Sequence, residues 1–260
     1  MADLVTGEEA FPSAGFPTPE SVLVDTDWAS LWHAYGPAAD VPVKLPALFS
    51  NDRNAREAAL QFLFDTVHHQ GTLYEATVPA ARYVVSVLRD PRTNLATDQR
   101  LPLRAELLTW IASVGHSASD DLEASRREHG FPLDDYPQAA AIRTMRPLLF
   151  TVAFDCTEDP DRRIREAAID ACIPLLDDPQ LQHHRAALVP LVRQVLGTSE
   201  LWQHRERAID ALDAWGEDSS GLEGQQNPFA FCDSDLPAIG TSVWSAGPWS
   251  STSDADTPPF

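Results

Sequence analysis

The sequence is poor in basic residues and in cysteine. Lysine and arginine together number 19 among 260 residues, against 39 aspartate and glutamate residues, and Lys44 is the only lysine. A formal net charge of −20 argues against a protein that binds nucleic acid through a basic surface, and favours a cationic partner. Three widely spaced cysteines without a CxxC pair indicate neither a disulfide framework nor a zinc knuckle.

Long apolar runs are also missing. The longest, residues 147–154, is far shorter than the roughly 20 residues that a membrane span needs. Residues 1–15 contain acids where a secretory signal requires a basic region, and no apolar run follows them. We therefore expect a cytoplasmic protein with no membrane partner.

Common catalytic motifs are absent as well. The sequence has no GxxxxGK phosphate loop, no GxSxG elbow and no HExxH zinc pair. The pairs His68-His69 and His183-His184 are the most metal-like features, but adjacent helical residues point about 100° apart and do not share one ion unaided. We expect no catalytic residue, no metal and no cofactor, and we place Cys172 in the core.

One eight-residue pattern recurs four times. Its copies are REAALQFL (56–63), RAELLTWI (104–111), REAAIDAC (165–172) and RERAIDAL (205–212). Apolar residues recur at helical periodicity in each copy, and a more apolar segment precedes each one, at 41–49, 77–89, 142–154 and 186–196. The pattern predicts an all-α fold of stacked helical hairpins, because no single hairpin buries its own apolar face.

The third copy carries a family resemblance. Residues 159–168, DPDRRIREAA, resemble the second helix of the HEAT repeat, and residues 31–36 with 51–56 resemble the opening of a bacterial subgroup of HEAT-like proteins. The second copy departs from the pattern at Ala105 and Glu106. The resemblance implies an α-solenoid of about four to five HEAT-like hairpins over residues 25–215, with second helices lining its concave face.

The segments outside the repeats differ in composition. Residues 1–24 predict an extended acidic arm, and residues 216–260 predict a Gly/Ser/Pro-rich acidic tail that is disordered or docked. An insertion at 115–137 contains a short surface helix near Ser119. The repeated arginines Arg56, Arg104, Arg165 and Arg205 predict Asp–Arg bonds between adjacent repeats, with Asp52 and Asp161 as candidate acceptors.

The helix face opposite the core stripe is the expected binding surface. Positions 1, 5, 8 and 12 residues after each repeated arginine are predicted to face solvent. The candidate partner-binding residues are Glu57, Gln61, Phe64, His68, Glu166, Asp170, Asp177, Glu206, Asp210 and Asp213. Acids gathered on adjacent ridges repel one another, so this cluster indicates a ligand of opposite charge.

These observations predict a non-enzymatic scaffold that grips a basic protein on an acidic concave face. Bacterial HEAT-like proteins of this size resemble immunity or inhibitor proteins, so neutralisation of a basic toxin is the most concrete version. Two alternatives stay open: a lyase-like HEAT enzyme or accessory, which requires a pocket where histidine and acids converge on a small molecule or cofactor, and a plain assembly scaffold.

Overall fold

All four repeated blocks fold as helices. A computed structural model describes residues 16–95, 101–131 and 136–222, which belong to one compact unit. The blocks lie in α3 (Arg53–Phe62), α5 (Leu103–Ser117), α9 (Arg162–Leu175) and α11 (Trp202–Ala214), and a wider π-helical turn, η3 (Leu63–Val67), prolongs α3. The predicted all-α class is confirmed.

Helical segments also precede the blocks. They are α2 (Val41–Lys44) with η2 (Leu45–Phe49), α4 (Thr77–Val87), α7 (Pro137–Thr144) with α8 (Arg146–Phe154), and α10 (Arg185–Leu191) with the π-helical η8 (Val192–Leu196). The expected continuous helix over 142–154 is divided at Met145, and Pro147 in the first turn of α8 has no N–H to continue the preceding helix.

The remaining elements are short. They are α1 (Pro19–Asp25), η1 (Trp28–Ser30), the antiparallel strands β1 (Trp32–His33) and β2 (Gly36–Pro37), η4 (His69–Gly71), η5 (Pro91–Asn94), α6 (Asp120–Glu128) and η7 (Gln182–His184). The surface helix expected near Ser119 is α6, and the Ser119 side chain caps it by accepting from the Leu122 N–H.

Helix α1 differs from the expected extended arm. The Thr18 side chain accepts the Ser21 N–H, Pro19 opens the helix, and Val22 is buried where α1 packs on α4. Residues 19–24 are therefore helical. The rest of the predicted arm, 1–15, and the tail from 223 onward lie outside the described residues.

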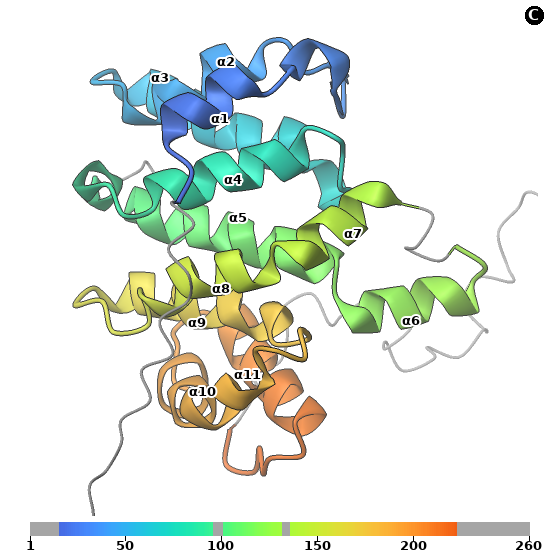
Figure 1. The fold of residues 1–260 in the computed structure, drawn as a ribbon. Coiled ribbons are helices and arrows are strands. Elements are labelled where there is room, and N and C mark those ends of the chain that lie inside the picture. Colours follow the sequence, from blue (N-terminus) through green and yellow to red (C-terminus); the bar gives the residue numbers. More distant parts are fainter. Residues whose placement is uncertain (1–15, 96–100, 132–135, 223–260) are drawn as a thin grey trace, which may run out of the picture. The chain divides into compact units, whose positions relative to one another are not determined.

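The helices of this unit form two layers. Helices α4 and α8 lie side by side in front, α5 and α9 lie behind them, and α6 projects to the right (Figure 1). We name α3, α5, α9 and α11 the second-helix layer. Trp110 Nε1 of α5 donates to the Leu63 carbonyl at 3.0 Å, and a Cβ on Gly115 would lie 3.2 Å from Pro174 of α9. Glycine at 115 thus permits the close approach of two parallel helices.

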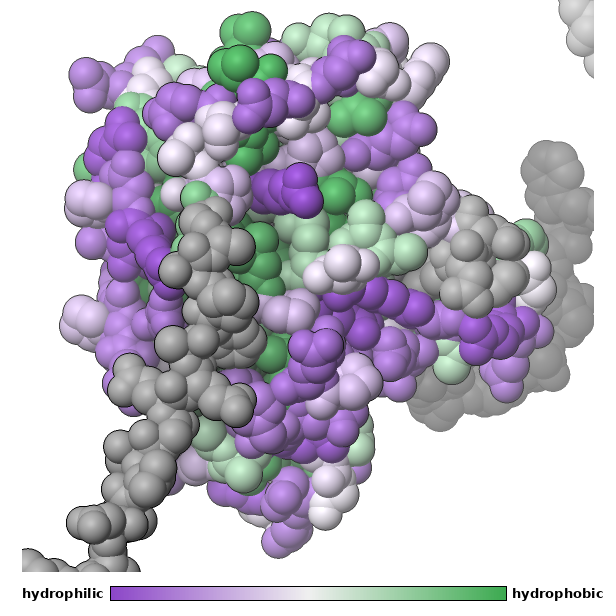
Figure 2. Space-filling model, viewed as in Figure 1, coloured by the Kyte–Doolittle hydropathy of each residue, from purple (hydrophilic) through white to green (hydrophobic). Residues whose placement is uncertain are grey.

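Most residues of the predicted core stripes are buried, whereas Ala55 and Phe62 of the first copy are half-buried. Ala59, Leu63 and Val67 of the first copy, and Ala168 and Cys172 of the third, are all at most 2% exposed. On the face with α4 and α8 in front, polar and apolar side chains alternate over the surface (Figure 2). Within the described ranges, no helix has both the length and the apolar character to cross a membrane.

The repeated arginines bind backbone rather than aspartate side chains. Three of them donate from Nη1 to the carbonyl six residues upstream: Arg56 to Ser50 at 2.8 Å, Arg165 to Asp159 at 2.7 Å, and Arg205 to Ser199. Only Arg104 bonds a carboxylate of the next repeat, that of Asp159 at 3.2 Å. The prediction for Asp52 and Asp161 is wrong, because each carboxylate caps its own helix by accepting the N–H two residues on.

A charge in the core stripe should unfold the protein. Ala59→Asp and Ala168→Asp each bury an unpaired carboxylate, at an expected cost on the order of 3 kcal/mol or more. Thermal unfolding followed by circular dichroism measures the loss. Ala58→Asp is the matched control, because Ala58 is exposed on the same helix as Ala59. Equal melting temperatures for the Ala58 and Ala59 variants would contradict the assigned helical phase.

Candidate functional site

The structure separates the ten predicted binding residues into three groups. Exposed residues are Gln61, Asp210 and Asp213; half-buried ones are Glu57, Phe64, Asp177 and Glu206; buried ones are His68, Glu166 and Asp170. The expectation that all ten face solvent is wrong for the buried group. The side chains of these three residues contact neighbouring helices or the loops before those helices. The position of a residue around its own helix therefore does not by itself predict whether the residue is exposed.

Glu166 is held by groups of its own chain. Arg162 donates from Nε to Glu166 Oε1 at 2.8 Å, and His204 Nδ1 of α11 lies 3.7 Å from the other oxygen. Arg162 also donates to the carbonyl of Thr198 at 2.8 Å. This carboxylate therefore helps to join α9 to the turn before α11.

Asp170 lies in a second cluster of charged groups. Arg207 Nε of α11 approaches Asp170 Oδ1 to 3.6 Å without a hydrogen bond, and Arg207 Nη1 donates to His116 Nδ1 at 3.5 Å. Partial burial, followed by the charge of Arg207, lowers the pKa of His116. Nδ1 of His116 is the acceptor of this hydrogen bond from Arg207, and the charge of Asp170 acts on the same imidazole in the opposite direction.

Asp177 connects α9 to the inserted helix α6. Its Oδ2 accepts the Asp120 N–H at 2.8 Å, and Arg146 Nη2 lies 3.5 Å away. Arg146 is itself buried and donates to Asp120 Oδ1 at 2.9 Å. Burial, with the charges of Asp120 and Asp121, raises the pKa of Asp177 despite that backbone bond.

His68 is buried against two serines of α5. Ser117 Oγ donates to the Ser113 carbonyl at 2.9 Å, so it accepts from His68 Nε2 at 2.9 Å, while Ser113 Oγ donates to Nδ1 at 3.3 Å. Both ring nitrogens are satisfied in the neutral imidazole. Burial lowers the pKa of His68 from 6.5 to about 4.

Glu106 of α5 differs from these acids because it has no ion pair with the described residues. It is 7% exposed, and its buried Oε1 has no hydrogen-bond partner within the described part of the chain. Burial, followed by the charge of Glu57 on α3, raises the pKa of Glu106. A buried carboxylate opposed by a second carboxylate is a costly arrangement that marks a candidate binding position.

Helix α11 and the segment directly after it contain acids that form no ion pair with the described residues. Asp210, Asp213 and Glu217 are exposed, and among residues 136–222 none of them forms an ion pair. They extend the second-helix layer beyond the cluster at Asp170. This end of the layer keeps negative charge available to a partner.

The sequence prediction missed Glu106 and Arg207, although one signal marks both. Two residues after each repeated arginine, the four copies have Ala58, Glu106, Ala167 and Arg207. Glu106 and Arg207 are the two residues at this position that are not alanine. Each places a charged group on the side of its helix nearest the preceding second helix. Asp120 was missed because it belongs to the insertion, whose position no repeat spacing predicts.

Metal and thiol chemistry receive no support from the described residues. No three histidine, cysteine, aspartate or glutamate side chains there are placed to hold one metal ion. His183 and His184 stack against each other at 4.0 Å between ring centroids, and His184 also contacts Phe150. Cys172 is buried as expected, and burial raises its thiol pKa and that of Cys156, the latter to about 11.

Comparison with known proteins gives no relative: no protein-family model, curated protein or solved structure matches this chain. The site must therefore be interpreted from its own chemistry.

The buried His68 predicts acid sensitivity. Because its pKa is about 4 when folded and 6.5 when unfolded, its contribution to stability is complete above pH 6.5 and is lost as pH falls toward 4. This histidine should cost about 2 kcal/mol of unfolding free energy between pH 7 and pH 5. Urea unfolding of the wild type and of His68→Gln should differ by that amount in pH dependence. His129→Gln, at an exposed histidine, should behave like the wild type, and identical slopes for all three proteins would contradict the assignment.

Proposed function

We propose that residues 25–215 form an α-solenoid of HEAT-like hairpins whose second-helix layer binds a basic protein without catalysing a reaction. The observation that carries the proposal is the set of exposed, unpaired acids Asp210, Asp213 and Glu217 at one end of that layer. The buried acids Glu166 and Asp170 contact groups of α11, whereas these three acids are exposed.

The net charge of the chain supports the same function. With 39 acids and 19 bases, the protein attracts cationic partners over a distance of about 10 Å at 0.1 M salt. A protein that neutralises a basic toxin, as immunity and inhibitor proteins do, is a concrete form of this proposal. A plain scaffold for a basic subunit uses the same surface.

One arrangement favours an enzyme as the second candidate. A neutral His116 lies beside Asp170, and its pKa also responds to the charges of Asp121 and Asp177. Histidine among carboxylates is suited to proton transfer. We rank this function second because Asp170 and Asp177 each lie beside an arginine that links structural elements.

Neutralising the exposed acids of α11 and the segment directly after it should weaken partner binding. The partner is first isolated by affinity purification from the native host and identified. The triple variant Asp210→Asn, Asp213→Asn and Glu217→Gln should lower its affinity roughly tenfold or more, because charge pairs across the interface are lost. Calorimetric titration at two salt concentrations measures the affinity, and wild-type binding should weaken with salt.

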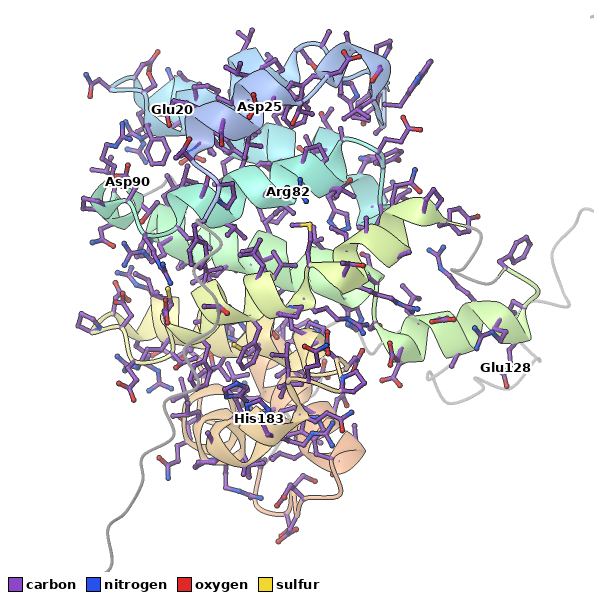
Figure 3. The ribbon with its side chains drawn as sticks, viewed as in Figure 1. Glu20, Asp25, Arg82, Asp90, Glu128 and His183 are labelled. Atoms are coloured by element: carbon purple, nitrogen blue, oxygen red, sulfur yellow. The ribbon has the colours of Figure 1, made fainter. Side chains whose placement is uncertain are left out.

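The matched control carries the same change in charge elsewhere. Glu20 and Asp25 lie on α1, and Glu128 lies at the end of α6 (Figure 3). All three are exposed acids, so the variant Glu20→Gln, Asp25→Asn and Glu128→Gln should bind the partner like the wild type. Equal weakening by both triple variants would show only a net-charge effect. Co-purification of a small molecule with no basic protein would favour the enzyme.

A further inference from the structure

Helix α5 contains an ionisable group without a partner among the described residues. Glu106 is more than nine-tenths buried, and it forms neither a hydrogen bond nor an ion pair with the described residues. Burial, followed by the negative charge of Glu57 on α3, raises the pKa of Glu106. The free protein therefore keeps a desolvated carboxylate close to a second acid.

The fourth repeat shows what this position can hold instead. Arg207 occupies the same offset as Glu106, and it faces the preceding second helix, with Nε 3.6 Å from Asp170 Oδ1. There, an acid of one helix meets an arginine of the next. In the second repeat an acid occupies the position of this arginine, so no arginine at this offset faces the preceding helix.

The fold itself does not require a charge at this offset. The first and third copies have Ala58 and Ala167 there, and both lie within regular helices. A buried charge costs free energy unless it is paired. Glu106 therefore weakens the free protein without serving the packing, which is the behaviour expected of a binding residue.

We propose that Glu106 binds the guanidinium group of an arginine side chain from the basic partner. This inference rests on the proposed function and adds the position of one contact. A guanidinium donates parallel N–H groups to a carboxylate and is more weakly hydrated than an ammonium, so it suits a carboxylate that has lost most of its contact with water. Thr109, one turn after Glu106 on the same side of α5, is exposed, so solvent reaches this side of the helix.

The experiment uses the full chain and N-acetyl-L-arginine amide as the probe. Carboxyl carbon resonances of glutamate are followed by NMR as the probe is added, with sodium chloride of equal ionic strength as the reference titration. The resonance of Glu106 should shift in a saturable manner with the probe and not with the salt. A shift of equal size with both would overturn the proposal, since it would report screening alone.

The variant Glu106→Gln provides two readouts. Binding of the probe should weaken roughly tenfold or more, because the charged acceptor is gone. The melting temperature of the free protein should rise, because a buried unpaired charge is removed; a structural role predicts that it falls. Glu128→Gln makes the same chemical change at an exposed position and should alter neither quantity. Unchanged probe affinity or a lower melting temperature in Glu106→Gln would overturn the proposal.

A second variant places a positive charge at position 106 itself. Glu106→Arg gives the second repeat the residue type found at Arg207, so it should fold, melt at a higher temperature than the wild type and no longer bind the probe. Retained probe binding in this variant would overturn the proposal.

The failure of this site is distinguishable from the failure of the proposed function. Wild-type affinity of Glu106→Gln for an identified basic partner would remove this contact and leave the function intact. Saturable probe binding, with no basic protein among the partners, would preserve the site and remove the function.

Discussion

The close parallel packing of the second helices is the constraint on which the rest of this structure depends. Helices α5 and α9 approach each other so closely that a side chain at Gly115 would press on Pro174. At such distances the flanks of each helix, as well as its core stripe, lose contact with water. Polar groups on those flanks must then find partners inside the protein or remain unsatisfied at considerable cost.

Most of the polar groups in this layer do find partners. His68 is satisfied by two serines, Glu166 by Arg162, and the Asp177 carboxylate by the first N–H group of α6. These contacts use the acids that an isolated helix would present to solvent. The acids of this layer are thus divided between those that contact neighbouring helices and those, such as Asp210 and Asp213 of α11, that stay exposed to a partner.

Glu106 belongs to neither kind. It is buried like the acids that join helices but has no partner like the acids on α11. A group in this condition lowers the stability of the free protein, and a cationic ligand would restore the balance. Binding sites commonly contain groups that destabilise the free protein and that gain a partner when the ligand binds. The layer therefore offers a partner two kinds of contact: long-range attraction at α11 and one desolvated acceptor on α5.

The sequence by itself determined the helices and their core stripes. A repeat of eight residues with 3.6-residue periodicity was enough to locate α3, α5, α9 and α11, because burial of an apolar stripe is a property of one helix and its pattern. The capping of α3 by Asp52 and of α9 by Asp161 is equally local, since each carboxylate accepts an N–H only two residues away. The binding surface was not determined in this way. Whether Asp170 or Asp210 meets water depends on how closely the neighbouring helix approaches, and that distance is set by residues far away in the sequence, such as Gly115 and Pro174. Tertiary structure alone decided which acids are paired, because an arginine and a carboxylate on different helices become partners only when packing brings their side chains together.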